Sequence, residues 1–428
     1  MHIPLPTPFR KYLFLFVSFV AVSFYVHWCS KAWLAARAAN PASFPGLTKA
    51  VHLQPGDANY HYLLGRYHIL ISQSPQLALP SFLQAASLNP HRSDYWFSLA
   101  TIYEVLGDPA SEKFSLERAI HADPTTPTVA WEAANFYLAQ GDVDQALREF
   151  NVVLKSGSYR IPDSIRLCWQ AKPDAEYLVR SVLPPNPDVY FTLLDYLVSI
   201  RQNAPAAQVW AHLVQLNQPV ERSRVLEYVR VLLASQDVTQ AMLVWQQAAN
   251  LADLAAYQPS PDNLIINGDF SLDILNAGFG WRYDEVPGVE LALDPTQSRS
   301  GRQSLSISYD SANLSDSGLS QQIPVQPNNT YEFSANFKAP DIQGAGGPQF
   351  LIMDAGSGKQ YFASDDLKDA DFWKQISGTF TTGPDARLLI LRIQRVPSQS
   401  PIRGKLWIDG LRLKPQSPST EKAGAPHE

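Results

Sequence analysis

The sequence predicts a multidomain protein with one apolar helix, an all-α stack of helical repeats and an all-β sandwich. Three observations predict it: an uncharged stretch from Tyr12 to Ser30, residue pairs that recur at a fixed spacing, and apolar–polar alternation after Asp262. The expected parts are a cytoplasmic tail, a transmembrane anchor, a helical domain, a linker, a β-domain and a disordered tail, at residues 1–11, 12–30, 41–256, 257–262, 263–415 and 416–428.

The uncharged stretch has the length and the flanks of a transmembrane helix. Its 19 residues span about 28 Å as a helix, close to the ~30 Å hydrocarbon core of a bilayer. Arg10 and Lys11 close one end and Lys31 the other, so the cations leave the orientation open. A cleaved signal peptide and a soluble apolar helix are the alternatives. We expect an uncleaved anchor, because signal peptides have a shorter apolar core that ends in small residues.

Bulk composition describes a globular protein and excludes some classes of function. Hydrophobic residues make up 45% of the chain, charged residues 17%, and the net charge is −6. This balance is typical of a chain that folds around cores and offers no electrostatic basis for binding nucleic acid. Cys29 and Cys168 are the two cysteines, so neither a disulfide framework nor a cysteine-based metal site is expected.

A repeat in the helical part starts from a Gly-Asp pair. Gly107-Asp108 recurs as Gly141-Asp142, and 141 − 107 = 34. Three more pairs have the same offset: Ala100 and Ala134, Tyr103 and Tyr137, Pro90 and Pro124. This period and residue order resemble the tetratricopeptide repeat. The resemblance implies a stack of helical hairpins whose concave surface grips a protein partner; a rigid spacer is the alternative.

Small residues and glycines explain why such a repeat folds. Gly65, Ala100 and Ala134 let antiparallel helices approach closely, and Gly107 and Gly141 permit the positive φ that ends a helix. Further degenerate hairpins are expected at 188–202 with 206–216 and at 223–235 with 238–254. The proline-rich passage 159–187 reads equally as a hairpin or a loop.

After Asp262 the pattern becomes that of β-strands separated by Gly, Pro, Asn and Asp. Strand length and composition are found at 304–309, 330–337, 349–353, 376–381, 387–394 and 405–413. Roughly 150 residues of short strands with turn signals predict a β-sandwich or jelly roll.

Several motifs in this part occur in a familiar order. They are Asn263-Leu-Ile-Ile-Asn-Gly-Asp-Phe-Ser271, Gly280-Trp281, Ser300-Gly301, Tyr331-Glu-Phe-Ser-Ala-Asn-Phe-Lys338, Trp373 and Leu406-Trp-Ile-Asp409. In this order they resemble the jelly-roll carbohydrate-binding modules of xylanases and cellulases, within the galactose-binding-like superfamily. The motifs are mostly structural, so the resemblance implies a fold more than a ligand. Phe270, Tyr331, Phe333, Trp373 and Trp407 are expected to pack between the sheets.

A polysaccharide site would need open aromatic rings and planar polar groups aimed at hydroxyls. The candidate residues share one of these properties: Trp281, Arg282, Tyr283, Gln349, Tyr361, Phe362, Arg392 and Gln394. The alternative is that Trp281 is buried and the others are scattered over the surface.

Similar modules hold a structural calcium ion near the chain ends, which the resemblance assigns here to Asp269 and Asp409. Calcium prefers several carboxylate and carbonyl oxygens. Ser271 stands where such modules often supply a glutamate, so one ligand is missing from the expected set.

The sequence contains no nucleophile elbow, no HExxH pair and no dinucleotide-binding glycine pattern, so we expect no enzyme. The expected protein is a scaffold of the bacterial inner membrane, with a single span and its C-terminal domains in the periplasm. Proteins built in this way resemble accessory components of exopolysaccharide or cell-surface glycan assembly and export. A protein–protein scaffold without sugar binding and, more remotely, a glycoside-active enzyme are the alternatives.

Overall fold

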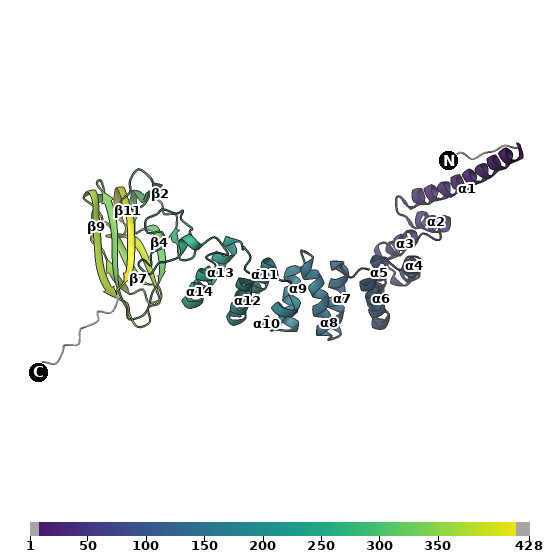
Figure 1. The fold of residues 1–428 in the computed structure, drawn as a ribbon, viewed down its shortest axis with the longest axis horizontal. Coiled ribbons are helices and arrows are strands. Elements are labelled where there is room, and N and C mark those ends of the chain that lie inside the picture. The colour runs from purple at the N-terminus through teal and green to yellow at the C-terminus, as the bar shows by residue number, and fades with distance from the viewer. Residues whose placement is uncertain (1–7, 417–428) are drawn as a thin grey trace. The chain divides into compact units, whose positions relative to one another are not determined.

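The computed structural model describes residues 8–416 of the chain, as a run of helices followed by a two-sheet β-domain (Figure 1). The predicted helical stack and β-sandwich are therefore both present. The predicted tails at 1–11 and 416–428 fall mostly on residues 1–7 and 417–428, which lie outside the described residues.

The first helix, α1, contains the whole uncharged stretch and extends beyond it on both sides. It runs from Pro8 to Ala39, and its most apolar 18-residue window has a mean hydropathy of 1.8 with no residue buried. Among the described residues it is the one helix long and apolar enough to cross a membrane. A signal sequence near the N-terminus has the same features, so the structure supports an anchor or a signal equally.

Thirteen further α-helices follow α1, with a π-helical turn η1 after α10 and a 3₁₀ turn η2 after α14 in the described chain. Their bounds are α2 Phe44–Leu53, α3 Ala58–Leu70, α4 Pro75–Leu88, α5 Ser93–Leu106, α6 Pro109–Ala122, α7 Pro127–Ala139, α8 Val143–Lys155, α9 Ile161–Ala171, α10 Ala175–Tyr177, η1 Leu178–Val182, α11 Pro187–Ser199, α12 Asn203–Leu216, α13 Arg222–Ala234, α14 Val238–Gln247 and η2 Ala255–Tyr257.

The two Gly-Asp pairs have the backbone conformation and the capping hydrogen bonds that the repeat turns need. Gly107 has φ +74° and Gly141 has φ +78°, and nothing lies within 4 Å of a Cβ built on either residue. The left-handed backbone alone therefore explains these glycines. Asp108 begins α6 by accepting a hydrogen bond from Ser111 N, and Asp142 begins α8 in the same way from Gln145 N. Each pair thus ends one helix and caps the next.

Close helix packing also follows the prediction. A Cβ on Gly65 of α3 would lie 2.8 Å from the Phe82 ring of α4, and Ala100 and Ala134 are buried. The undecided passage 159–187 is mostly helical, with α9 followed by the short α10 and η1. The helix expected at 238–254 ends earlier, at Gln247, because the chain turns back and brings Tyr257 O to the indole Nε1 of Trp245.

Eleven strands form the described β-domain. Their bounds are β1 Trp281–Tyr283, β2 Val289–Asp294, β3 Ser304–Leu314, β4 Asp316–Pro324, β5 Thr330–Ala339, β6 Gln343–Gly344, β7 Gly347–Asp354, β8 Gln360–Ala363, β9 Ala370–Thr381, β10 Leu388–Val396 and β11 Ser400–Pro415. The six predicted strands are all present, whereas β1, β2, β4, β6 and β8 were not predicted.

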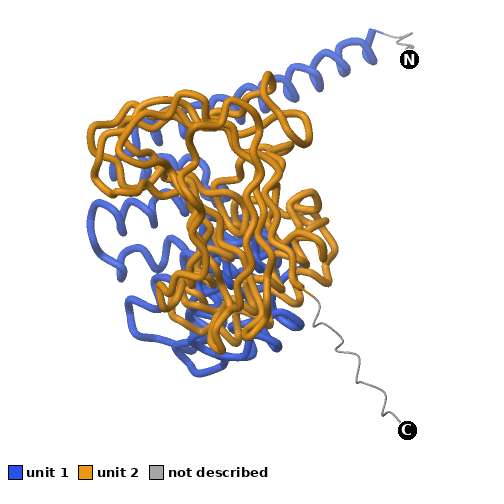
Figure 2. Tube along the Cα trace, turned by 90° about the vertical axis from the view of Figure 1, so that its left-hand side faces the viewer, with its two compact units in different colours: residues 1–196 blue, residues 197–428 orange. Residues whose placement is uncertain are grey.

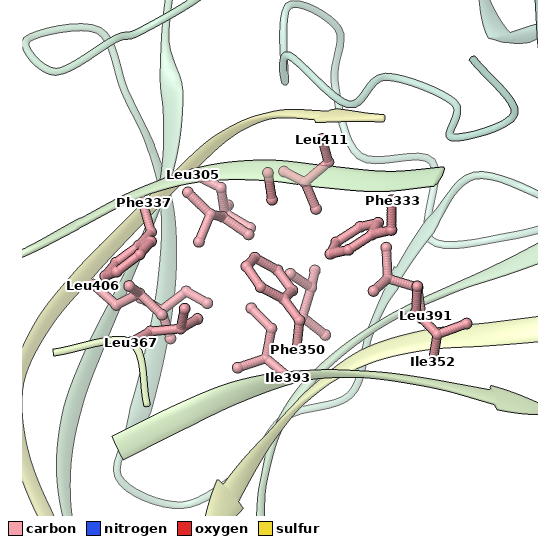
Figure 3. Close-up of a cluster of buried hydrophobic side chains, with 14 of the residues drawn as sticks. Leu305, Phe333, Phe337, Phe350, Ile352, Leu367, Leu391, Ile393, Leu406 and Leu411 are labelled. Carbon is pink, nitrogen blue, oxygen red and sulfur yellow. The ribbon is translucent and has the colours of Figure 1, made fainter. Parts of the chain in front are cut away.

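The strands form two antiparallel sheets with one hydrophobic core between them. A five-stranded sheet has the order β1-β4-β10-β7-β8, and a six-stranded sheet has the order β2-β3-β11-β5-β9 with β6 on β11. Figure 3 shows side chains of both sheets meeting in this core. Phe333 of β5 meets Phe350 of β7 edge to face, with ring centroids 5.6 Å apart. The alternation expected of a sandwich is thus realised.

By its contacts the chain divides into two compact units, Met1–Tyr196 and Leu197–Glu428, which Figure 2 colours separately. In this division the last helices group with the β-domain, and the domain bounds expected from the sequence stay a prediction. Within the second unit, Trp245 of α14 donates to Tyr257 O at 2.9 Å and meets Phe279 edge to face at 5.6 Å. Tyr257 Oη in turn donates to Asp273 O at 3.1 Å. Residues at the expected linker therefore join α14 to the β-domain.

Candidate functional site

The outer face of the five-stranded sheet gathers polar side chains from three of its central strands and from edge strand β1. Along β4, Ser317, Leu319, Gln321 and Ile323 point into the sandwich, so the alternate residues point outward. The register continues this alternation across the sheet. We call the outward residues Arg282, Asp316, Ser320, Gln322, Gln349, Arg392 and Gln394 the polar face.

Strand pairing places the polar face in three rows. Asp316, Gln394 and Gln349 lie opposite one another in the first row. The second row contains Arg282, Ser320, Arg392 and Leu351. The third row contains Gln322, Ile390 and Met353. Side chains directly opposite on one sheet face have Cβ atoms roughly 5 Å apart, so the members of a row are neighbours. Leu351 is covered, at 4% exposed, whereas the polar members of the rows are partly exposed.

A β-bulge brings the only carboxylate of the three rows to an arginine. The β4–β10 register shifts between Arg392 and Gln394, next to Gly318, whose φ is +80°. A Cβ on Gly318 would lie 2.1 Å from Asp284 O, so another residue would not fit there. Asp316 Oδ2 then lies 3.5 Å from Arg392 Nε, in an ion pair whose side chains are 32% and 38% exposed.

The charged groups of the polar face keep unused hydrogen-bonding capacity. Four of its buried side-chain atoms have no hydrogen-bond partner: Arg282 Nε, Asp316 Oδ2, Gln322 Oε1 and Arg392 Nε. Burial lowers the pKa of Arg282, with Asp284 opposing the shift. Burial raises the pKa of Asp316, opposed by the Gly318 N–H and by Arg392. Two of the four atoms, Asp316 Oδ2 and Arg392 Nε, face each other across the ion pair, and polar atoms buried without a hydrogen bond are costly.

The predicted aromatic residues do not lie on this face. Trp281 is 2% exposed, donates from Nε1 to Asn267 O at 3.0 Å and stacks on Phe270. The expectation of an open Trp281 ring is therefore wrong, because its position in β1 points into the sandwich. Tyr283 pairs with inward-facing Leu319 and so lies on the opposite side from Arg282.

The other two aromatic candidates also pack toward the core. Tyr361 stacks on Phe380 and its hydroxyl accepts a hydrogen bond from Gly383 N at 2.8 Å. Phe362 packs against Phe333, with ring centroids 5.2 Å apart. Both rings are half-buried and pack against core residues, so the expectation that they are open platforms is corrected. Along the described strands β1, β4, β7 and β10, no outward position carries an aromatic residue.

Trp407, by contrast, is more exposed than predicted. It was expected between the sheets, but the burial pattern of β11 places it on the outer face of the six-stranded sheet, half-buried. Its Nε1 donates to Asp294 Oδ2 at 2.8 Å, and Lys338 and Lys405 lie 5.8 and 5.5 Å from its ring. The polar partners of its indole explain why this position tolerates water.

The residues expected to bind calcium use their oxygens otherwise. Asp409 is fully buried, and its carboxylate accepts hydrogen bonds from Arg299 N, Ser300 N and Ser300 Oγ at 2.5, 2.7 and 2.7 Å. Asp269 accepts from the backbone N–H and the hydroxyl of Ser271. In the described chain no cluster of three or more His, Cys, Asp or Glu side chains suits a metal ion. These donor-filled carboxylates do not fit a calcium site.

The helical repeats contain a smaller candidate surface. A cleft of about 210 Å³ lies between α5, α6 and α7, and Glu104, Glu112 and Glu132 line it. Burial raises the pKa of Glu112, and the nearby Glu104 adds to the shift. Burial also raises the pKa of Glu132, where Arg160 opposes the shift and Glu104 adds to it. The cleft is therefore acidic.

Comparison with known proteins locates the family resemblance in the β-domain. Residues 262–399 match the family model of a carbohydrate-binding domain, named CBM_4_9. The matched segment contains every residue of the polar face. No curated protein matches the chain.

Solved structures resemble each part of the chain separately. A structure titled "CBM4 structure and function" is 18% identical, covering 36% of this chain and 99% of its own, with a TM-score of 0.29. The CBM22-1 xylan-binding domain of Paenibacillus barcinonensis Xyn10C is 16% identical over 38% of this chain and 99% of its own, with a TM-score of 0.27. The Pseudomonas aeruginosa pilF structure is 19% identical over 45% of this chain and 91% of its own, with a TM-score of 0.25.

Proposed function

We propose that this protein is a non-catalytic membrane-anchored scaffold that binds a polysaccharide on the polar face and a protein partner on its helical repeats. The observation that carries the proposal is the polar face itself, within a domain that matches a carbohydrate-binding family. Planar guanidinium, carboxylate and amide groups aligned in rows suit the hydroxyls of an extended glycan.

The length and exposure of α1 support attachment to the membrane. A helix of 32 residues whose apolar window is fully open to its surroundings needs a lipid environment or a partner. We propose that it stays attached and holds the helical repeats and the β-domain in the periplasm of a bacterial cell. In that position the protein would serve as an accessory component of exopolysaccharide or cell-surface glycan assembly and export.

A protein–protein scaffold that binds no sugar is the second candidate. The absence of aromatic residues at the outward positions of β1, β4, β7 and β10 favours it, because stacking on pyranose faces is a large part of sugar affinity in many sites. The two candidates differ in whether binding depends on hydrogen bonds from Arg392 and Gln394.

The deciding experiment measures polysaccharide binding by the full chain in detergent, with xylan, a β-glucan and a uronic-acid-containing polysaccharide as probes. We expect retention of at least one probe, and a loss of about tenfold or more in affinity for Arg392→Ala with Gln394→Ala, because each removes hydrogen bonds to the ligand. Arg403→Ala is the matched control, since Arg403 of β11 also pairs with an aspartate, Asp310 at 3.0 Å, on the other sheet.

Failure of the wild type to bind any probe would leave the scaffold without sugar binding as the better function. For the helical part, cross-linking in intact envelopes followed by purification should return components of glycan synthesis or export. Recovery of neither component class would contradict the proposed pathway.

A further inference from the structure

A crevice of about 850 Å³ lies within the second unit, between α14 and one end of the β-domain. Helix α14 contributes Met242, Leu243 and Gln246 to its lining, among others. The β-domain contributes residues of the β4–β5 and β9–β10 connections, and Tyr331 of β5. Its volume lies within the range of roughly 300–1,000 Å³ that is usual for ligand sites.

The crevice continues the polar face. Outward positions on β4 follow each other at every second residue, so Pro324 comes directly after Gln322. Pro324 pairs with Leu388, one row beyond the row of Gln322 and Ile390. Successive rows on one sheet face are about 6.8 Å apart, because each strand residue rises about 3.4 Å. Pro324 lines the crevice at the end of this outward row. Arg387, whose carbonyl accepts a hydrogen bond from Val325 N, lines it at the end of the sandwich, so the crevice begins where the polar face ends.

The wall formed by α14 is fixed in place. Trp245, two residues after Leu243, is fully buried and bonds to Tyr257 O, while Gln258 Nε2 donates to Trp245 O at 3.1 Å. A Cβ on Gly278 would lie 2.2 Å from the Trp245 ring, so loop and helix pack without a gap. A crevice between parts held in this way exists before any ligand binds, which lowers the entropic cost of binding.

The lining combines the two kinds of group that a sugar chain needs. Met242, Leu243 and Pro324 offer apolar surface, and Leu243 is 43% exposed. Gln246, Gln326 and Arg387 are exposed and offer amide and guanidinium groups. Pyranose rings have apolar faces and hydroxyl edges, so such a mixed lining suits them better than it suits a purely apolar segment.

We propose that the crevice binds a further segment of the same polysaccharide chain that lies on the polar face, so that helix α14 forms part of the glycan site. This inference rests on the proposed function and extends it, because it predicts preference for long glycan chains over short ones. The helical part would then recognise the ligand together with the β-domain.

The experiment compares short and long oligosaccharides of the xylan, β-glucan and uronic-acid series, titrated calorimetrically into the full chain in detergent. The wild type should bind long oligosaccharides more tightly than short ones. Leu243→Ser and Arg387→Ala should each reduce the affinity for long oligosaccharides by about tenfold, the scale of one lost hydrogen bond or apolar contact. Neither substitution should change the affinity for short oligosaccharides. Leu83→Ser in α4, where the leucine is 45% exposed, is the matched control.

Each outcome separates this inference from the proposed function. Arg392→Ala should lower the affinity for short and long oligosaccharides alike, because Arg392 lies on the polar face. If the wild type binds glycans but Leu243→Ser and Arg387→Ala bind long chains as the wild type does, the crevice inference is wrong and the proposed function stands. A gain of affinity on deleting residues 417–428, which follow from Pro415 in the lining, would make that segment the occupant and also overturn the inference.

Discussion

The contacts that stabilise the helical repeats join residues close in sequence, whereas those that stabilise the β-domain join residues far apart in sequence. In the repeats the decisive contacts are local: Asp108 caps α6 through Ser111, three residues away. In the β-domain they are remote: Asp409 binds Ser300 across 109 positions, and Leu413 N donates to Asn263 Oδ1 across 150. A substitution in a repeat should therefore loosen one turn, whereas one in the β-domain should release strands that are distant in sequence.

The largest effect is expected from Asp409→Ala. The substitution leaves the part-buried N–H groups of Arg299 and Ser300 without their acceptor, and each such loss costs about 1–3 kcal/mol. We expect the β-domain to lose about 4 kcal/mol of unfolding free energy. Hydrogen exchange followed by peptide mass spectrometry should show faster exchange along β3, β5 and β11 together, with α5 to α8 unchanged.

Two comparisons sharpen this prediction. Asp409→Asn keeps one acceptor oxygen and should cost less than Asp409→Ala. Addition of calcium or of a chelator should leave the unfolding midpoint of the wild type unchanged, because hydrogen-bond donors already fill the carboxylates of Asp409 and Asp269. A rise of the midpoint with calcium would contradict our interpretation of these residues.

A smaller effect is expected at the junction inside the second unit, from Gly278→Ala. Gly278 has φ +60° and its added Cβ would lie 2.2 Å from Trp245, so the substitution combines backbone strain with overlap. We expect a loss of about 2–3 kcal/mol in the closure of α14 on the β-domain, measured as protease cleavage between 257 and 262. Gly107→Ala is the control, because φ is +74° there but nothing lies within 4 Å of the new Cβ, so only strain remains.

This difference in range explains which parts of the fold could be predicted. The Gly-Asp pairs signal the repeat turns because the φ requirement and the cap lie in adjacent residues. Strand β4 gave no such signal, since two of its inward positions are the polar residues Ser317 and Gln321. Gln321 is satisfied there by both the N–H and the carbonyl of Ile266, a partner 55 positions away that the sequence does not reveal.

Part of the candidate site could also be predicted from the sequence. Arg282, Gln349, Arg392 and Gln394 were chosen as polar residues near or within strands, and the register places all four on one face. Their role in binding stays a prediction. Asp316, Ser320 and Gln322 were missed because they belong to the unpredicted β4. Trp281 was left between an open and a buried position, and Trp407 was assigned to the wrong side, because the face of an aromatic residue depends on a register that a one-residue slip reverses.

In the repeats, Asp108→Ala should cost about 1 kcal/mol, the usual value of an N-cap. The loss removes the hydrogen bond from Ser111 N and should appear as faster exchange in the first turn of α6 alone. Asp142→Ala should do the same at α8, since its carboxylate accepts from Gln145 N. Exchange that spreads from α6 into α8 would show that the repeats are coupled over a longer range than their contacts indicate.

The smallest effect is expected from Glu132→Gln, where the sign depends on pH. Because burial raises the pKa of Glu132 in the folded chain above its ordinary range, the folded state binds the proton more tightly than the unfolded state. This contribution to stability is complete below the unfolded pKa and is lost as pH rises through the raised folded pKa. At neutral pH the Gln variant should therefore be the more stable, by less than about 1 kcal/mol, and the difference should disappear in acid.

Glu227→Gln should show the opposite sign, because its hydrogen bond with Arg230 lowers the pKa of Glu227, so stability is lost as pH falls. The unfolding midpoints of both variants, measured from acid to neutral pH, test whether a local charge in each half of the helical region acts independently of the β-domain.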